Sequence, residues 1–232
     1  MLINKYLKIY TLELIRNKSA AFFTIIFPTI LLLLFSKNVP PTENAQWSML
    51  ISLANYAVQC AMLQALGMGI AFSNHRKWSE YVKILPASGI YSVIGRVLAM
   101  LLFAMLSLLL VLIAGIFWMA FTVSYLKLSI VFFVALAGGI PMGILGFYLG
   151  KMISPAAARS LFVLINIALF FAAFCFPDHG WLSFVRTFIP SYQWLTLSYD
   201  LAMKHSLDYL SLIGLAGYTA TFFVLAVYAT RK

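Results

Sequence analysis

Charged side chains are scarce in this chain. Of its 232 residues, six are Asp or Glu and sixteen are Lys or Arg, while 63% are hydrophobic and the mean hydropathy is +0.97. Globular domains hold roughly 45–50% apolar residues, so this composition excludes an ordinary soluble fold. In a soluble protein the net charge of +10 would suggest nucleic acid or another acidic partner. Here we expect no nucleic-acid partner, and we expect the charges to report membrane topology instead.

Groups that catalyse reactions or hold metals are also few. The three histidines, His75, His179 and His205, are far apart, and no two of them lie three or four residues from one another. The single Gly-Lys pair, at 150–151, follows a spacer of three residues where a P-loop has four. No serine nucleophile elbow occurs. The sequence therefore predicts no catalytic residue, no metal site, no bound cofactor and no ATP hydrolysis by this chain itself.

Carboxylates and cysteines are nearly absent from the apolar stretches. All six carboxylates lie outside these stretches, and one of them, Glu13, belongs to the amino-terminal segment. A proton relay built on intramembrane Asp or Glu is therefore disfavoured, and with it an ion-coupled carrier. Cys60 and Cys175 both fall within apolar stretches, where we interpret them as small packing residues.

Six long apolar stretches are the main feature that is present. A helix that crosses a membrane needs about 20 mostly apolar residues, and none of these stretches alternates as a membrane β-strand would. Pro28 lies inside the first and shortest one, where neighbouring helices can satisfy the freed carbonyl. We predict an all-α polytopic membrane protein, a single domain over residues 1–232 with six transmembrane helices, at about 20–35, 47–72, 91–120, 128–149, 160–176 and 210–230.

The basic residues set the expected orientation, because cytoplasmic loops are rich in Lys and Arg. With both termini cytoplasmic in the plasma membrane, the outer side receives four basic residues: Lys37, Lys127, Arg186 and Lys204. The inner side receives the other twelve: Lys5, Lys8, Arg16, Lys18, Arg76, Lys77, Lys83, Arg96, Lys151, Arg159, Arg231 and Lys232. No small-residue cleavage site follows the first stretch, which favours a retained span over a signal peptide.

Two segments on the predicted inner side are amphipathic. In residues 1–18, one helical face carries Ile3, Tyr6, Leu7, Tyr10 and Leu14, and the basic residues lie towards the other. This pattern predicts an interfacial or docking helix, with a plain topogenic leader as the alternative. In the loop 74–88, Trp78, Val82 and Leu85 recur at helical spacing and Pro86 ends the helix. That helix suits a protein partner, or an interfacial position anchored by Trp78.

The largest predicted outer segment, residues 177–209, is too apolar for an exposed loop. It contains two tryptophans and several Phe and Leu residues, together with Pro177 and Pro190. We expect short re-entrant helices that pack against the bundle and dip into the outer leaflet.

The predicted spans also hold neutral polar side chains. Asn55, Gln59 and Gln64 lie on span two and Asn166 lies in span five. They suit either a translocation pathway or interhelical hydrogen bonds. Small residues at these depths predict close helix contacts: Gly67, Gly69, Gly138, Gly139 and Gly143.

Three segments, in their order along the chain, resemble segments of a known protein family. The first is Glu13-Leu14-Ile15-Arg16-Asn17-Lys18, followed by Phe22-Phe23 and Phe27-Pro28; the second is Lys83-Ile84-Leu85-Pro86-Ala87-Ser88. The third runs from 143–146 through 156–159 and Asn166 to Phe176-Pro177 and Ile189-Pro190. Together with the six spans, they resemble the permease subunits of type-2 ATP-binding-cassette (ABC) exporters. One departure is His75-Arg76-Lys77-Trp78-Ser79, where that family commonly has a Glu-Arg-x-Gly-Thr-like run.

The resemblance implies an ATP-driven exporter of an amphipathic cargo: a peptide, drug, lipid or glycoconjugate. A second permease chain would pair with this one, as a homodimer or heterodimer, and a separate ABC ATPase subunit would bind ATP and Mg²⁺. Residues implied in ATPase coupling are His75, Arg76, Lys77, Trp78, Glu80, Lys83, Leu85, Pro86, Glu13 and Arg16. Spans two and five would face the pathway, which implies roles for Asn55, Gln59, Met62, Asn166 and Phe170.

Two other classes remain open. A non-transporting membrane immunity or sensor subunit would also have short loops and an apolar outer segment. An ion-coupled secondary carrier is less favoured, because intramembrane charges are so few.

Overall fold

A computed structural model of the chain describes residues 2–16, 18–74, 88–119, 124–175 and 181–230. Within these residues all regular structure is helical, including short π-helical segments labelled η. In chain order the elements are α1 (Leu2–Arg16), α2 (Lys18–Ala21), η1 (Phe22–Ile26), α3 (Phe27–Ser36), α4 (Glu43–Gln59), η2 (Cys60–Ala65), α5 (Leu66–Asn74), α7 (Ser88–Trp118), α8 (Tyr125–Met152), α9 (Pro155–Cys175), α10 (Trp181–Thr187), α11 (Pro190–Tyr199), η3 (Asp200–Lys204) and α12 (Tyr209–Thr230).

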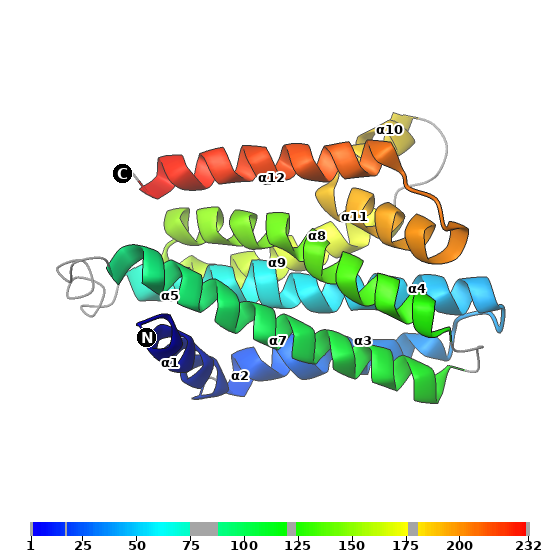
Figure 1. Ribbon diagram of the computed structural model, residues 1–232, viewed down its shortest axis with the longest axis horizontal. Helices are drawn as coiled ribbons and strands as arrows, with labels where there is room; N and C mark the ends of the chain where they lie inside the picture. Colours follow the sequence, from blue (N-terminus) through cyan, green and yellow to red (C-terminus); the bar gives the residue numbers. More distant parts are fainter. Residues whose placement is uncertain (1, 17, 75–87, 120–123, 176–180, 231–232) are drawn as a thin grey trace.

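The long helices lie side by side in an elongated bundle, and α4, η2 and α5 run through its middle as one continuous helix (Figure 1). The most apolar part of this central helix is 94% buried, whereas the corresponding figure for α12 is 17%. Every residue from Leu50 to Gly67 is buried, so this helix is covered by neighbouring helices on all sides. The central helix is therefore the element against which the other helices are positioned.

In the part of the chain that the structure describes, five helices are long and apolar enough to cross a membrane, and they correspond to the second to sixth predicted spans. They support the predicted all-helical, polytopic membrane architecture. The first predicted span corresponds to a shorter apolar helix, Phe22–Ser36. Its π-helical turn η1 directly precedes Pro28, which has no N–H to give to the preceding turn. The Ser107 hydroxyl donates to the nearby Ile25 carbonyl oxygen at 3.3 Å, so a neighbouring helix supplies a donor next to the proline.

The amino-terminal amphipathic helix is α1, and its predicted apolar face packs against α7. Leu14 is buried, and the backbone of Leu7 and the Cβ of Tyr6 lie against Gly95 near the start of α7. Figure 1 shows α1 at the end of the bundle that also holds the carboxyl end of α12. The two ends of the chain thus lie at one end of the bundle, which we call the terminal end.

The predicted outer segment folds into short helices at the opposite end. These are α10, α11 and η3, and α11 packs against α4, α8, α9 and α12. His205 ends η3 in the left-handed conformation, with φ of 51°. Of these short helices, α11 packs against the long helices of the bundle, and its re-entrant position in a membrane stays a prediction.

Close helix contacts occur at four of the five glycines for which they were predicted. A Cβ at Gly67 would overlap the Phe162 ring, and one at Gly139 or Gly143 would meet Val58 or Met62 of the central helix. Gly138 faces Trp194. The prediction for Gly69 is wrong, because a Cβ there would have nothing within 4 Å.

Candidate functional site

The predicted pathway residues gather around the central helix. Asn55, Gln59 and Met62 are buried along it, and Asn166 is fully buried on α9. Phe170, one helical turn after Asn166, is half-buried and packs its ring 4.4 Å from the centroid of Tyr56. We call Asn55, Gln59, Gln64 and Asn166 the amide cluster.

Hydrogen bonds in the amide cluster tie α9 to the central helix. The Gln59 Nε2 donates to the Asn166 carbonyl oxygen at 3.0 Å. The Asn166 Nδ2 donates to Gln64 Oε1 at 2.9 Å and lies 3.2 Å from Cys60 Sγ. The interhelical interpretation of these polar residues is thereby confirmed, and Cys60 packs as predicted while also accepting this contact.

One atom of the cluster has no partner. The Asn166 Oδ1 is buried and accepts no hydrogen bond in the described structure. A buried carbonyl without a donor costs roughly 1–3 kcal/mol, so this position favours any arrangement that brings a donor to it. The amide cluster thus joins α9 to the central helix, while one of its buried acceptor atoms has no hydrogen-bond donor.

The fourth amide connects the central helix to α11. The Asn55 Nδ2 donates to Ser198 Oγ at 3.1 Å, and the Ser198 hydroxyl donates to the Trp194 carbonyl oxygen at 2.9 Å. Ser198 is fully buried. Sequence reasoning missed Ser198, because a serine in a short outer helix gives no local signal that it faces the second span.

A second residue of α11 fixes it to α8. The Trp194 indole N–H donates to the Val134 carbonyl oxygen at 3.2 Å, and the ring lies against Gly138. On the same face, Ser191 donates to the Leu169 carbonyl oxygen of α9 at 2.6 Å. Ser191, Trp194 and Ser198 therefore hold α11 against α9, α8 and α4. Sequence analysis interpreted Trp194 only as an apolar residue.

The π-helical turn η2 lies within the central helix, between Gln59 and Leu66. A π-helical turn holds one residue more than an α-helical turn, so it changes which side chains face α9. Gln64 lies within this turn and meets Asn166. The six residues of η2 carry no proline or glycine that would have signalled it.

The predicted coupling residues on the loop lie outside the described residues: His75, Arg76, Lys77, Trp78, Glu80, Lys83, Leu85 and Pro86. The two helices that flank this loop are described, and Arg96 joins them. Its Nη1 donates to the Ser73 Oγ of α5 at 2.8 Å. Its guanidinium carbon also lies 4.3 Å from the centroid of the Tyr10 ring on α1.

Glu13 and Arg16, the other predicted coupling residues, both lie on α1. Glu13 is half-buried and Arg16 is exposed. Arg96 thus brings α1, the end of α5 and the start of α7 together at the terminal end, and we call this contact the Arg96 junction. Sequence analysis assigned Arg96 a topological role alone.

The opposite end carries an ion pair between an exposed lysine and a buried aspartate. The Lys204 Nζ lies 2.7 Å from Asp200 Oδ1, and this hydrogen bond raises the pKa of Lys204 above its ordinary value. A second pair joins Lys127 to Glu43 at 3.4 Å. Both pairs connect residues that the predicted topology placed on the outer side.

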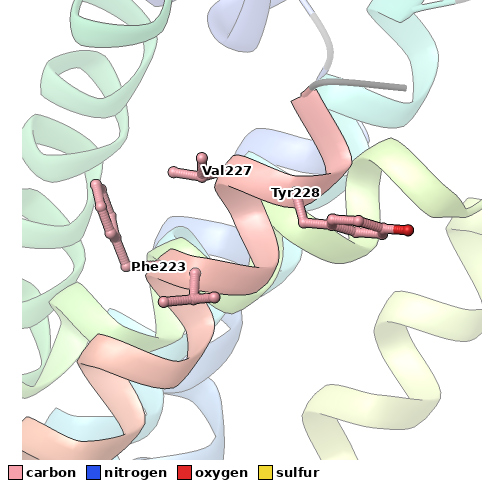
Figure 2. A pocket seen from close by; sticks show the side chains of 4 residues that line it. Phe223, Val227 and Tyr228 are labelled. Atoms are coloured by element: carbon pink, nitrogen blue, oxygen red, sulfur yellow. The ribbon is translucent and has the colours of Figure 1, made fainter.

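A shallow apolar groove lies on the surface of α12, far along the chain from the amide cluster. It is lined by Phe223, Val224, Val227 and Tyr228, which project from the last turns of the helix (Figure 2). All four side chains are exposed. Such a surface is ordinary for a helix that faces lipid.

The residues of the candidate site offer hydrogen bonds and apolar contacts. The amide cluster is neutral, and no group of three or more His, Cys, Asp or Glu residues that could hold a metal ion occurs in the described ranges. No family model matches the chain, and comparisons with curated proteins and with solved structures also find no match. The inference of function therefore rests on the chain's own residues and geometry.

Proposed function

We propose that this chain is the transmembrane subunit of an ATP-driven exporter of the type-2 ABC class, and that a separate ATPase subunit binds ATP and Mg²⁺. Five helices long enough to cross a membrane, found among the described residues, support this proposal, because a transmembrane subunit is built from such helices. The exporter would act as a pair of permease chains in the plasma membrane. Its cargo would be amphipathic, in keeping with the aromatic and neutral amide side chains around the central helix.

A sixth crossing belongs to the proposal. The elements α2, η1 and α3 follow one another without a break from Lys18 to Ser36. At 1.5 Å per residue such a run approaches the ~30 Å hydrocarbon core. Both termini would then be cytoplasmic, and the terminal end would face the cytoplasm with most of the basic residues.

The Arg96 junction is the observation that carries the proposal. An ATPase below the membrane can act on the bundle only through elements at its cytoplasmic end. The Arg96 side chain joins α1, α5 and α7 there, on both sides of the loop 75–87. A push on the loop or on α1 would therefore reach the same three helices.

The central helix would carry that motion to the pathway. Because α5 is continuous with η2 and α4, displacement of its end moves the helix that holds Asn55, Gln59 and Met62. Contacts that would have to change are the Asn166–Gln64 and Asn55–Ser198 hydrogen bonds. Breaking them frees amide groups on spans two and five to meet a cargo.

The experiment is reconstitution of the chain with and without an ATPase subunit encoded beside it. We expect no ATP hydrolysis by the chain alone, and ATP-dependent export from vesicles once both subunits are present. Trp78→Ala and Glu80→Ala should abolish coupling while the helical bundle remains folded. Arg159→Gln, on the exposed start of α9, is the matched control and should export normally.

Two outcomes would contradict the proposal. Export that follows a proton or sodium gradient without ATP would indicate a secondary carrier. Binding of a toxin or lipid without any transport would indicate an immunity or sensor subunit.

A further inference from the structure

The helix α1 has a second face that nothing covers among the described residues. Successive residues of a helix are turned by about 100°, so the face opposite the α7 contact is fixed once Tyr6, Tyr10 and Leu14 are placed inward. Seven side chains on this side are exposed: the neutral Asn4, and six charged or apolar residues, Lys5, Lys8, Ile9, Leu12, Ile15 and Arg16. We call these six residues the outward face of α1.

Half of the outward face is apolar. Ile9, Leu12 and Ile15 are 49%, 43% and 54% exposed, and they recur at the three-residue spacing that keeps them on one side of the helix. On the opposite side the apolar residues already pack against α7, so the outward ones do not serve the core. An amphipathic helix with large apolar and basic residues together on its free face is typical of helices that lie in a membrane interface.

The other half of the outward face carries positive charges that no nearby carboxylate of the described residues neutralises. Lys5, Lys8 and Arg16 lie beside the apolar residues, and in the described ranges none of them has an ion-pair partner. The only carboxylate of α1, Glu13, lies at the edge of this face and is half-buried. The face therefore presents three positive charges with no negative charge among them.

The position of α1 brings this face to headgroup level. After Arg16 the chain passes through α2 into the apolar helix Phe22–Ser36, so α1 lies where an apolar helix begins. It lies at the terminal end, beside the start of α7 (Figure 1). A helix there, packed on its inner side, has its outer side next to the phosphates of the adjoining leaflet.

We propose that the outward face of α1 binds the anionic phospholipid surface of that leaflet. Lys5, Lys8 and Arg16 contact headgroup phosphates, and Ile9, Leu12 and Ile15 insert among the upper acyl segments. A protein partner is disfavoured because cores of protein interfaces are depleted in Lys, whereas here Lys5 and Lys8 lie directly among the apolar residues. The inference gives Arg16, which the resemblance links to ATPase coupling, a lipid contact instead. It does not depend on the proposed function.

The test uses the purified full-length chain with a photoreactive benzophenone side chain in place of Leu12. The protein is reconstituted in vesicles of phosphatidylcholine mixed with phosphatidylglycerol, and lipid adducts are identified by mass. The ratio of phosphatidylglycerol adducts to phosphatidylcholine adducts should exceed the ratio of the two lipids in the bilayer at least roughly fivefold, as expected for about 1 kcal/mol per nearby basic residue. The triple variant Lys5→Gln, Lys8→Gln and Arg16→Gln should reduce the adduct ratio to that of the bilayer.

Two controls make the test specific. The same probe in place of Leu164, which is 63% exposed in the middle of α9, should capture both lipids at their bulk shares. High salt should weaken the enrichment at position 12 without any substitution, because it screens exposed charges. Capture of both lipids at bulk shares at position 12 would overturn the proposal. So would cross-linking to a protein, without lipid adducts, when the labelled chain is irradiated in its native membrane.

Discussion

The indole ring of Trp194 on α11 lies directly against Gly138 of α8, where a Cβ would overlap the ring. The same indole donates its N–H to the Val134 carbonyl oxygen, four residues before Gly138. Trp194 is fully buried. One side chain therefore fixes the position of the outer helix both by shape and by a hydrogen bond, and the glycine is what makes room for it.

A methyl group at position 138 should loosen this contact. We expect Gly138→Ala to lower the free energy of unfolding by roughly 1–3 kcal/mol, the usual cost of overpacking. Gly217→Ala is the matched control, because Gly217 is also helical and has nothing within 4 Å of a Cβ. It should leave stability unchanged or raise it slightly through better helix propensity. Unfolding in detergent micelles measures both, and equal effects would show that the Trp194 contact is unimportant.

The hydrogen bond between Asn166 and Gln64 should appear as a coupling energy. In a double-mutant cycle with Asn166→Leu and Gln64→Met, we expect a coupling of about 0.6 kcal/mol and at most ~1.7 kcal/mol. The control cycle pairs Asn55→Leu with Gln64→Met. These two residues lie roughly 13 Å apart along the helix and share no bond, so their effects should add. A coupling as large in the control cycle would contradict the bonding that we describe.

Loss of the Arg96 contact with Tyr10 and loss of its contact with Ser73 should increase amide hydrogen exchange in different regions of the protein. Tyr10→Leu removes the ring beneath the guanidinium and should raise amide exchange in α1 by roughly fivefold, for a cation–π contact of about 1 kcal/mol. Ser73→Ala removes the hydrogen bond and should raise exchange at the end of α5 while leaving α1 protected. Exchange measured peptide by peptide distinguishes the two regions. If either variant changed both regions equally, the Arg96 junction would not be built from separable contacts.

The Lys204–Asp200 pair predicts a weak dependence of stability on alkaline pH. The hydrogen bond to Asp200 raises the pKa of Lys204 in the folded state above its ordinary value of 10.5. Its stabilisation is therefore complete below that value and is lost as the pH rises through the raised pKa. Lys204 is largely exposed, so the effect is small.

The pH prediction is checked by thermal unfolding from neutral to alkaline pH. Lys204→Gln should flatten the alkaline fall in melting temperature that the parent chain shows. Lys37→Gln removes an exposed charge at the same end of the bundle and should leave the fall intact. A fall of the same size in Lys204→Gln would assign it to other groups.

The helices were the most predictable part of this fold. Long apolar runs identified every long helix, and the predicted ends lie within five residues of the observed ones, because apolar length is a strong signal. The first apolar run differs from the others. Its apolar helix is shorter, and η1 and Pro28 interrupt its α-helical pattern. The prediction of six spans extends beyond the five helices that meet the length and hydropathy of a span.

The partners within the site were less predictable than its residue types. Neutral amides on spans two and five suited interhelical hydrogen bonds as well as a pathway, and two such bonds join these two helices. Sequence could not show that Asn55 bonds to Ser198 rather than to Asn166, because that choice depends on where α11 packs. Likewise Arg96 looked like a topological charge, since Tyr10 and Ser73 are brought to it only by the fold.

The π-helical turn η2 makes the central helix sensitive to chain length at one place. Deleting one residue between Cys60 and Ala65 would turn η2 into an ordinary α-helical turn and rotate everything beyond it by about 100°. Gly67, which now faces Phe162, would then turn towards a different helix, although no residue of α5 had changed. On each side of η2, the side chains of the central helix thus face the neighbouring helices that they pack against. The extra residue in η2 provides the rotation that makes both sets of contacts possible in one helix.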